Sequence, residues 1–256
     1  MTDLAPDAPA PNRARIFLRD LLKRRMVAIG LAILIVFVLL AALAPLLAPY
    51  APGKLSIVNR LKPPSAIYWF GTDEFGRDIF SRMLYAGRLS LSVGAAVVLL
   101  SSLIGVTLGL LAGFFKRLDT PIARLIDAMM AFPDILLAIA LVAALGPSLM
   151  TVIIALSIVY APRLARIVRA ATLVIRELPY VEAARAFGNS TSRIMFRHVL
   201  PNIVSPITVQ ATFIFASAML AEAGLSFLGL GVSPDIPTRG TMISSGPQYN
   251  RQDDWV

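Results

Sequence analysis

Three acidic residues within six positions, Asp73, Glu74 and Asp78, are close enough in the sequence to suggest shared chemistry. Neighbouring carboxylates can bind calcium, but this spacing is not that of an EF-hand, and Arg77 stands among them. We therefore expect an Asp–Arg network that fixes a loop. A metal site is the less favoured alternative.

Covalent catalysis and nucleotide binding find little support. The sequence has no cysteine and one histidine, His198, so thiolate metal sites are excluded and a Ser-His-Asp site would need His198. Its one Gly-Lys pair, Gly53-Lys54, is followed by Leu55, which does not make a phosphate-binding loop. We expect a non-catalytic chain that binds no cofactor or metal of its own.

Three further acidic residues, Asp127, Asp134 and Glu222, fall inside apolar stretches, where an unpaired charge would be costly. Asp127 and Asp134 are seven positions apart, close to two helical turns, so we expect them to share one helix face. They could line a polar path. The favoured alternative pairs Asp127 with Arg124 and makes Glu222 a satisfied packing residue.

The elements that carry these residues are predicted to be membrane helices. Of 256 residues, 57% are hydrophobic and 15% charged, and a soluble domain of this length could not hide so much apolar surface. The fold class is therefore an all-α, polytopic membrane helix bundle. A net charge of +9 could suggest nucleic acid, but the charges are distributed as membrane topology requires, and we expect no nucleic-acid partner.

About five transmembrane helices are expected, the third interrupted at Pro133. Their ranges are 26–48, 89–115, 122–145, 149–171 and 203–230. Residues 1–25 are a tail with an amphipathic helix on the lipid surface, 49–88 an extracytoplasmic loop, 89–231 the core, and 232–256 an extracytoplasmic tail. Sixteen of the 24 Lys and Arg residues then fall on the side of the N-terminus, which the positive-inside rule makes cytoplasmic.

Gly105, Gly109 and Gly113 recur every four residues in the second span. Small residues at this spacing lie on one helix face and allow another backbone to approach closely. We expect a helix-packing face here.

Residues 176–202 form a polar interval between two apolar spans and are predicted to be two short helices with a sharp bend. Pro179 suits a first helical turn and Gly188 the position after a helix end, while Ser190 or Thr191 can cap the second helix. Such a unit could be a plain interfacial connector. It could also dock a partner protein.

This interval resembles the EAA loop of ABC importer permeases. Glu182-Ala183-Ala184, three residues, Gly188, nine residues, His198, one residue and Leu200-Pro201 follow the spacing of that motif, with His198 where isoleucine is usual. The extracytoplasmic residues also resemble a signature of the dipeptide, oligopeptide and nickel branch, here of its second, C-type permease. They are Gly71, Thr72, Asp73, Gly76, Arg77 and Asp78.

The resemblance implies a type I ABC importer permease in a bacterial or archaeal cytoplasmic membrane. Its partners would be a second homologous permease, two ATPase subunits that carry ATP and Mg, and an extracytoplasmic substrate-binding protein. The substrate would be a di- or oligopeptide, with nickel chelates or glutathione as alternatives. Members of the family have a sixth span, which we expect to be missing here.

The resemblance also assigns roles in the 176–202 loop. Glu182 would pair with a basic residue of an ATPase groove, Ala183 and Ala184 would let the helix carrying Arg185 seat closely, and Gly188 would make the bend. The competing function is a self-sufficient secondary transporter or channel, which would work without an ATPase.

Overall fold

The computed structural model describes residues 23–231, 237–238 and 240–243. Within these ranges it is helical and has no strand, only an isolated bridge between Thr72 and Asp78. Four helices are long and apolar enough to cross a membrane, or five if one bent pair forms a single span. The predicted all-α membrane bundle is confirmed.

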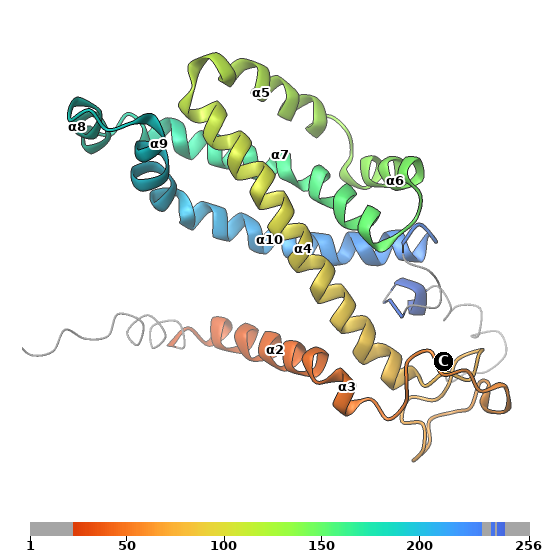
Figure 1. Ribbon diagram of the computed structural model, residues 1–256. Helices are drawn as coiled ribbons and strands as arrows, with labels where there is room; N and C mark the ends of the chain where they lie inside the picture. The colour runs from red at the N-terminus through yellow and green to blue at the C-terminus, as the bar shows by residue number, and fades with distance from the viewer. Residues whose placement is uncertain (1–22, 232–236, 239, 244–256) are drawn as a thin grey trace, which may run out of the picture.

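The helices follow the chain in the order that Figure 1 labels. They are α2 (Arg25–Ala42), α3 (Ala44–Leu47), α4 (Ile79–Phe114), α5 (Lys116–Met130), α6 (Asp134–Leu145), α7 (Leu149–Ile175), α8 (Pro179–Ala186), α9 (Thr191–Ile194) and α10 (Val204–Phe227). A π turn (Met195–Val199) and a 3-10 turn (Leu200–Ile203) join α9 to α10.

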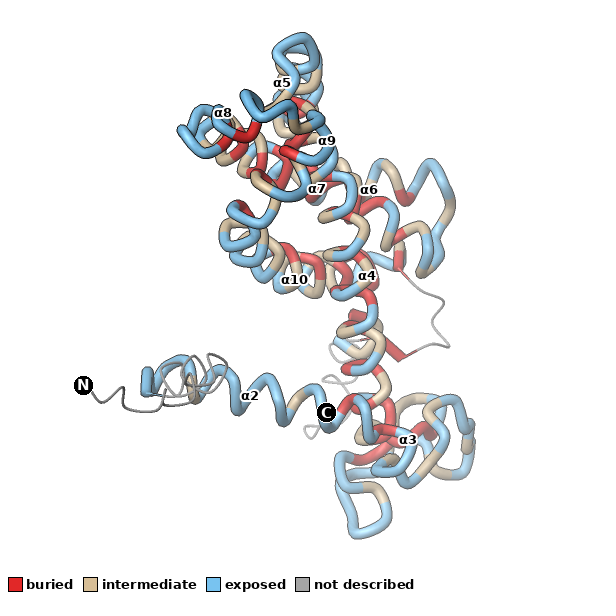
Figure 2. The backbone as a smooth tube through the Cα atoms, turned by 60° about the vertical axis from the view of Figure 1, so that its left-hand side comes forward, coloured by how far each residue is buried: buried red, intermediate tan, exposed pale blue. Residues whose placement is uncertain are grey.

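Helix α4 is the centre of the arrangement. It crosses α7 over its C-terminal half, packs on α10, and meets α2 and α3 near its other end (Figures 1 and 2). The three glycines spaced by four all face α7. A Cβ atom on Gly109 would lie 2.6 Å from the Ala165 carbonyl oxygen, and one on Gly105 would lie 2.8 Å from that of Ala161. The absence of side chains therefore sets the distance between α4 and α7.

Helix α4 begins at Ile79, ten residues before the span expected at 89, so its first turns lie in the segment expected to be an extracytoplasmic loop. The Asp78 side chain caps the helix by accepting a hydrogen bond from the Ser81 backbone N–H at 2.8 Å. Because Arg82 and Arg88 occupy the first turns, hydropathy alone does not reveal that the helix already begins at Ile79.

The third span is two helices rather than one. The axes of α5 and α6 differ by 90° across the break before Asp134. Pro133 has extended backbone angles, φ −58° and ψ 129°, and lacks the N–H that would continue the helix. The expectation that Asp127 and Asp134 share a face of one helix is therefore wrong. Lys116 and Arg117 are the first residues of α5.

The segment expected as the first span, 26–48, contains two helices, because α2 stops at Ala42 and a separate turn, α3, begins at Ala44 with Pro45 in its first positions. Helix α2 contacts α4 but is otherwise largely exposed (Figure 2). Its side chains are apolar all round, as a surface covered by lipid or by another membrane subunit requires. The predicted amphipathic helix up to 22 and most of the 232–256 tail lie outside the described residues.

Candidate functional site

The EAA-like loop (176–202) is two short helices around a capped bend. Gly188 has φ +76°, a conformation that L side chains rarely adopt, and its N–H donates to the Arg185 carbonyl at 3.0 Å. The N–H of Asn189 reaches back to the Ala184 carbonyl at 3.2 Å, which completes a Schellman-type helix end. Ser190 then caps α9. The bend is thus encoded locally.

The two faces of α8 differ. Ala184 is buried against the chain's own core, whereas Glu182, Ala183 and Arg185 are exposed. Of the two alanines, only Ala183 is therefore exposed. Phe187, just before the bend, is 88% exposed, and the sequence analysis missed it. Its only signal is an aromatic residue beside the turn glycine.

The second half of the EAA-like motif, His198 to Pro201, holds α8 in place through contacts with Tyr180 and Asn202. The Tyr180 hydroxyl donates to the His198 carbonyl at 3.4 Å, and the Asn202 side chain donates to the same oxygen at 2.7 Å. The rings of Tyr180 and His198 lie 6.5 Å apart. Leu200 and Pro201 belong to the 3-10 turn that leads into α10. These residues position α8 relative to α10.

Arg176 connects this loop to the central helix. Its Nη1 donates to the Gly113 carbonyl at 2.7 Å, and its Nε pairs with Glu177 at 2.9 Å. Gly113 lies in the last turn of α4, where carbonyls lack helical partners and favour a cation. The guanidinium thus fixes the start of the loop to the end of α4.

Three Asp–Arg pairs join the bent α5–α6 segment to α7. Asp134 lies 2.6 Å from Arg163 and Asp127 lies 2.6 Å from Arg166. The expected pairing of Asp127 with Arg124 is wrong. The third pair joins Asp119 to Arg169. The arginines recur every three residues, so they lie on neighbouring positions of α7 and meet both helices of the bent segment.

Glu222 on α10 is fully buried. Its carboxylate accepts hydrogen bonds from the Ser90 hydroxyl of α4 at 3.2 Å and the Ser226 hydroxyl at 2.9 Å. This geometry favours the packing interpretation over a path-lining one, because both oxygens are used between two packed helices.

Glu222→Gln is expected to leave stability nearly unchanged, because an amide can still hydrogen-bond both hydroxyls. Glu222→Ala is expected to lower it by about 2 kcal/mol, through an internal void and two lost hydrogen bonds. Thermal unfolding of the detergent-purified chain measures both. If glutamine destabilises as much as alanine, the charge matters and the packing interpretation fails.

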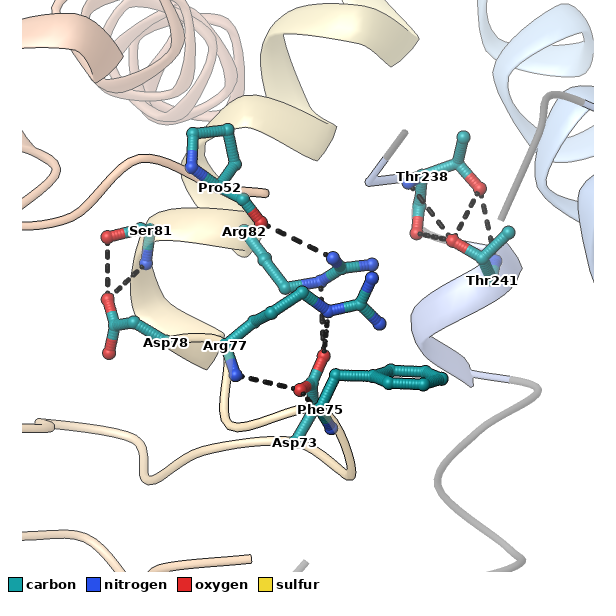
Figure 3. A network of polar contacts seen from close by, with 9 residues as sticks. All are labelled: Pro52, Asp73, Phe75, Arg77, Asp78, Ser81, Arg82, Thr238 and Thr241. Carbon is teal, nitrogen blue, oxygen red and sulfur yellow. Dashed lines mark hydrogen bonds and ion pairs between the residues drawn. The ribbon is translucent and has the colours of Figure 1, made fainter. Parts of the chain in front are cut away.

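The loop before α4 is held by the Asp–Arg network that Figure 3 shows. One Asp73 oxygen accepts from the N–H groups of Phe75 and Arg77, both at 2.9 Å. The other lies 2.7 Å from Nε of Arg77 and 3.6 Å from Nε of Arg82. Both guanidinium groups are buried. Asp78 instead caps α4, so these two carboxylates have separate tasks.

The remaining signature residues shape the same loop. The Thr72 hydroxyl donates to the Asn59 carbonyl at 2.5 Å and accepts from the Lys62 N–H at 2.8 Å. Gly71 and Gly76 have φ of +75° and +69°. Among the described residues, no group of three or more His, Cys, Asp or Glu side chains could hold a metal.

Asp73→Ala is expected to cost about 3 kcal/mol, because it removes the carboxylate from two buried guanidinium groups. Glu74→Ala is the control and should change stability by less than about 0.5 kcal/mol. Thermal unfolding with and without calcium checks both. Calcium should not alter the midpoint, and a rise that Asp73→Ala abolishes would favour the metal site.

Comparison with known proteins identifies the family. Residues 105–248 match the model of the binding-protein-dependent transport system inner membrane component, and residues 12–64 match the N-terminal transmembrane domain of oligopeptide transport permease C. A putative peptide transport system permease protein of Brucella suis biovar 1 is 48% identical over 93% of this chain and 80% of its own length. The dipeptide transport system permease protein DppC of Alkalihalophilus pseudofirmus is 44% identical over 98% of this chain and 85% of its own.

A third relative, the glutathione transport system permease protein GsiD of Pectobacterium atrosepticum, is 42% identical over 90% of this chain and 77% of its own length. Both family matches and these coverages agree with the helical membrane bundle described above. The chain therefore belongs to the family of inner membrane permease subunits of binding-protein-dependent ABC importers.

Proposed function

We propose that this chain is one of two membrane subunits of an ATP-driven importer of di- or oligopeptides. The three relatives above are named for transport of peptides, of dipeptides and of glutathione, itself a tripeptide. This supports peptides over nickel as the substrate class. The working importer contains a second permease, two ATPase subunits that bind ATP and Mg, and an extracytoplasmic binding protein.

One observation carries the coupling role, namely the exposed end of α8. Phe187 is exposed there, next to the bend at Gly188, and Glu182 is exposed in the first turn of the same helix. An exposed apolar ring after the end of α8 and an exposed carboxylate in its first turn suit a groove that has an apolar pocket and, apart from it, a basic rim. The charge bias of the loops supports a cytoplasmic N-terminus, which places α8 on the ATP side.

Coupling then has a structural route. Closure of the ATPases moves α8, the brace between Tyr180 and His198 passes the movement to α10, and Arg176 passes it to α4. The chain itself supplies no hydrolytic group in this scheme.

The test is affinity purification from mild detergent, with the parent chain and a Glu182→Ala/Gly188→Pro double variant. Proline cannot adopt the φ of +76° found at Gly188, so the bend and the exposed carboxylate are both lost. The parent should recover two ATPases and a second permease, and the variant should lose the ATPases. Glu177→Ala, on the same loop but before α8, should keep them. If the parent imports peptide from an ion gradient without an ATPase, the chain is a secondary transporter.

A further inference from the structure

A cavity of about 410 Å³ lies among the end of α5, the middle of α7 and the first half of α10. Its polar lining consists of Tyr160, Arg163, Arg166, Gln210 and Ser217, and the rest is mainly apolar, including Phe213. The volume is that of a small-molecule site. Arg163 and Arg166 belong to the ion pairs described above, but no other residue of the lining takes part in those pairs.

The charges that line the cavity are cationic. Asp134 and Asp127 each pair with an arginine through its Nη2 at 2.6 Å, but neither carboxylate is part of the lining. No hydrogen bond among the described residues occupies Nε or Nη1 of Arg163 or Arg166. Each guanidinium carries five N–H donors in a fork that matches a carboxylate, so donors remain for a ligand.

The positions of Arg163 and Arg166 along α7 indicate which surroundings their charged groups face. Measured along α7 from Leu149, they follow after about 21 and 26 Å, within the about 30 Å of a hydrocarbon layer. Both side chains are about half exposed in the isolated chain. At about 26 Å, Arg166 is within about 4 Å of the far side of such a layer, where a long side chain can reach the interface. Because both arginines line one cavity together with Gln210 and Ser217, we take this face to border an aqueous path or a second subunit.

We propose that this cavity binds the C-terminal carboxylate of the transported peptide on its way through the permease, an inference that rests on the proposed function. Arg163 and Arg166 take the carboxylate. The half-buried Gln210, whose amide has no hydrogen bond among the described residues, takes a backbone group of the peptide. The apolar lining around Phe213 accepts the last side chain.

The cavity also lies between α7 and α10, which we expect to move relative to each other during transport. The Tyr160 hydroxyl of α7 donates to the Ser217 carbonyl of α10 at 3.3 Å, and both residues line the cavity. A shift of α10 against α7 changes the distance between the arginines and Gln210. Peptide affinity at this site therefore falls or rises with the position of α10, which lets the site release its ligand.

Photolabelling of the assembled permease–ATPase complex tests this inference. The complex is placed in phosphatidylcholine nanodiscs without the binding protein, so that the latter does not select for a carboxylate. The probe is a dipeptide ending in benzoylphenylalanine, used as the free acid and as the C-terminal amide. The acid should label the α7 and α10 peptides at least about tenfold more than the amide, as expected for lost charge-assisted hydrogen bonds.

Variants localise the effect. Arg163→Gln/Arg166→Gln should abolish the preference for the acid. Arg169→Gln should retain it, because Arg169 belongs to the same series of ion pairs but does not line the cavity. Each variant is first tested for recovery of the ATPases, so that a variant that fails to assemble is recognised. If the double variant fails to assemble, the difference in labelling between acid and amide in the parent decides whether the inference holds.

Three results would overturn the inference: equal labelling by acid and amide, an unchanged preference in the double variant, or loss of labelling when phosphatidylglycerol is added. The last would assign the cavity to an anionic lipid. If the parent still performs ATP-driven peptide uptake, only this inference fails. If the parent recovers no ATPase, the proposed function fails instead.

Discussion

Gly109→Ala should lower the unfolding midpoint of the purified chain by roughly 5–10 °C. The new Cβ would lie 2.6 Å from both the Ala165 carbonyl oxygen and the Val168 Cβ. Backbone cannot yield as a flexible side chain can, so α4 and α7 have to separate along the most extensive helix contact of the bundle. Overpacking of this kind costs about 2–3 kcal/mol, which corresponds to that shift for a chain of this size.

The matched control is the same substitution in α10. A Cβ on Gly224 meets nothing within 4 Å, and alanine is the better helix former by about 1 kcal/mol. Gly224→Ala should therefore leave the midpoint unchanged or raise it. Thermal unfolding followed by size-exclusion chromatography compares the two variants. Equal midpoints would show that the glycine series does not set the α4–α7 distance.

Phe187→Ser is expected to reduce ATP-driven peptide uptake by at least about tenfold and to leave the stability of the chain unchanged. The ring is 88% exposed, so its removal costs the isolated chain little. A buried aromatic anchor at the centre of an interface typically contributes 2 kcal/mol or more, about a thirtyfold change in affinity. Uptake into proteoliposomes that contain the complete importer measures the effect.

The control residue is Phe196, which is also exposed on the same loop but lies in the π turn beyond the bend. Phe196→Ser should retain most of the uptake. The reverse order of effects would place the docking surface on the second half of the loop. A parallel Glu182→Arg variant should resemble Phe187→Ser, since reversed charge repels a basic rim.

Local signals in the sequence predicted the local structure well. The bend at Gly188, the cap at Ser190 and the helical start at Pro179 all follow from backbone preferences that need no tertiary contact. The glycine spacing in α4 predicted a packing face for the same reason, since it is fixed by helix geometry. Which helix would fill that face could not be read from the spacing.

The predictions that differ from the structure concern ion-pair partners and the directions in which side chains face. Both are decided only when the helices pack together. Asp127 has Arg124 nearby in the sequence, yet its charge meets Arg166 because the bend at Pro133 lays α5 along α7. The early start of α4 depended on a cap that hydropathy does not register. The exposure of Phe187 and the burial of Ala184 depend on how α8 is rotated against its neighbours.

Helix α4 has one more consequence. It runs for 36 residues without a proline, about 54 Å, well beyond the thickness of a hydrocarbon layer. At its first turn the helix is held by the Asp78 cap and by the ion pair of Arg82 with Asp73. At its last turn Arg176 donates a hydrogen bond to the Gly113 carbonyl. Because no proline interrupts its backbone hydrogen bonds, we expect the helix to tilt as one body. A tilt of only about 5° at the α8 end would then displace the opposite end by about 5 Å, which would carry a movement on one membrane face to the other.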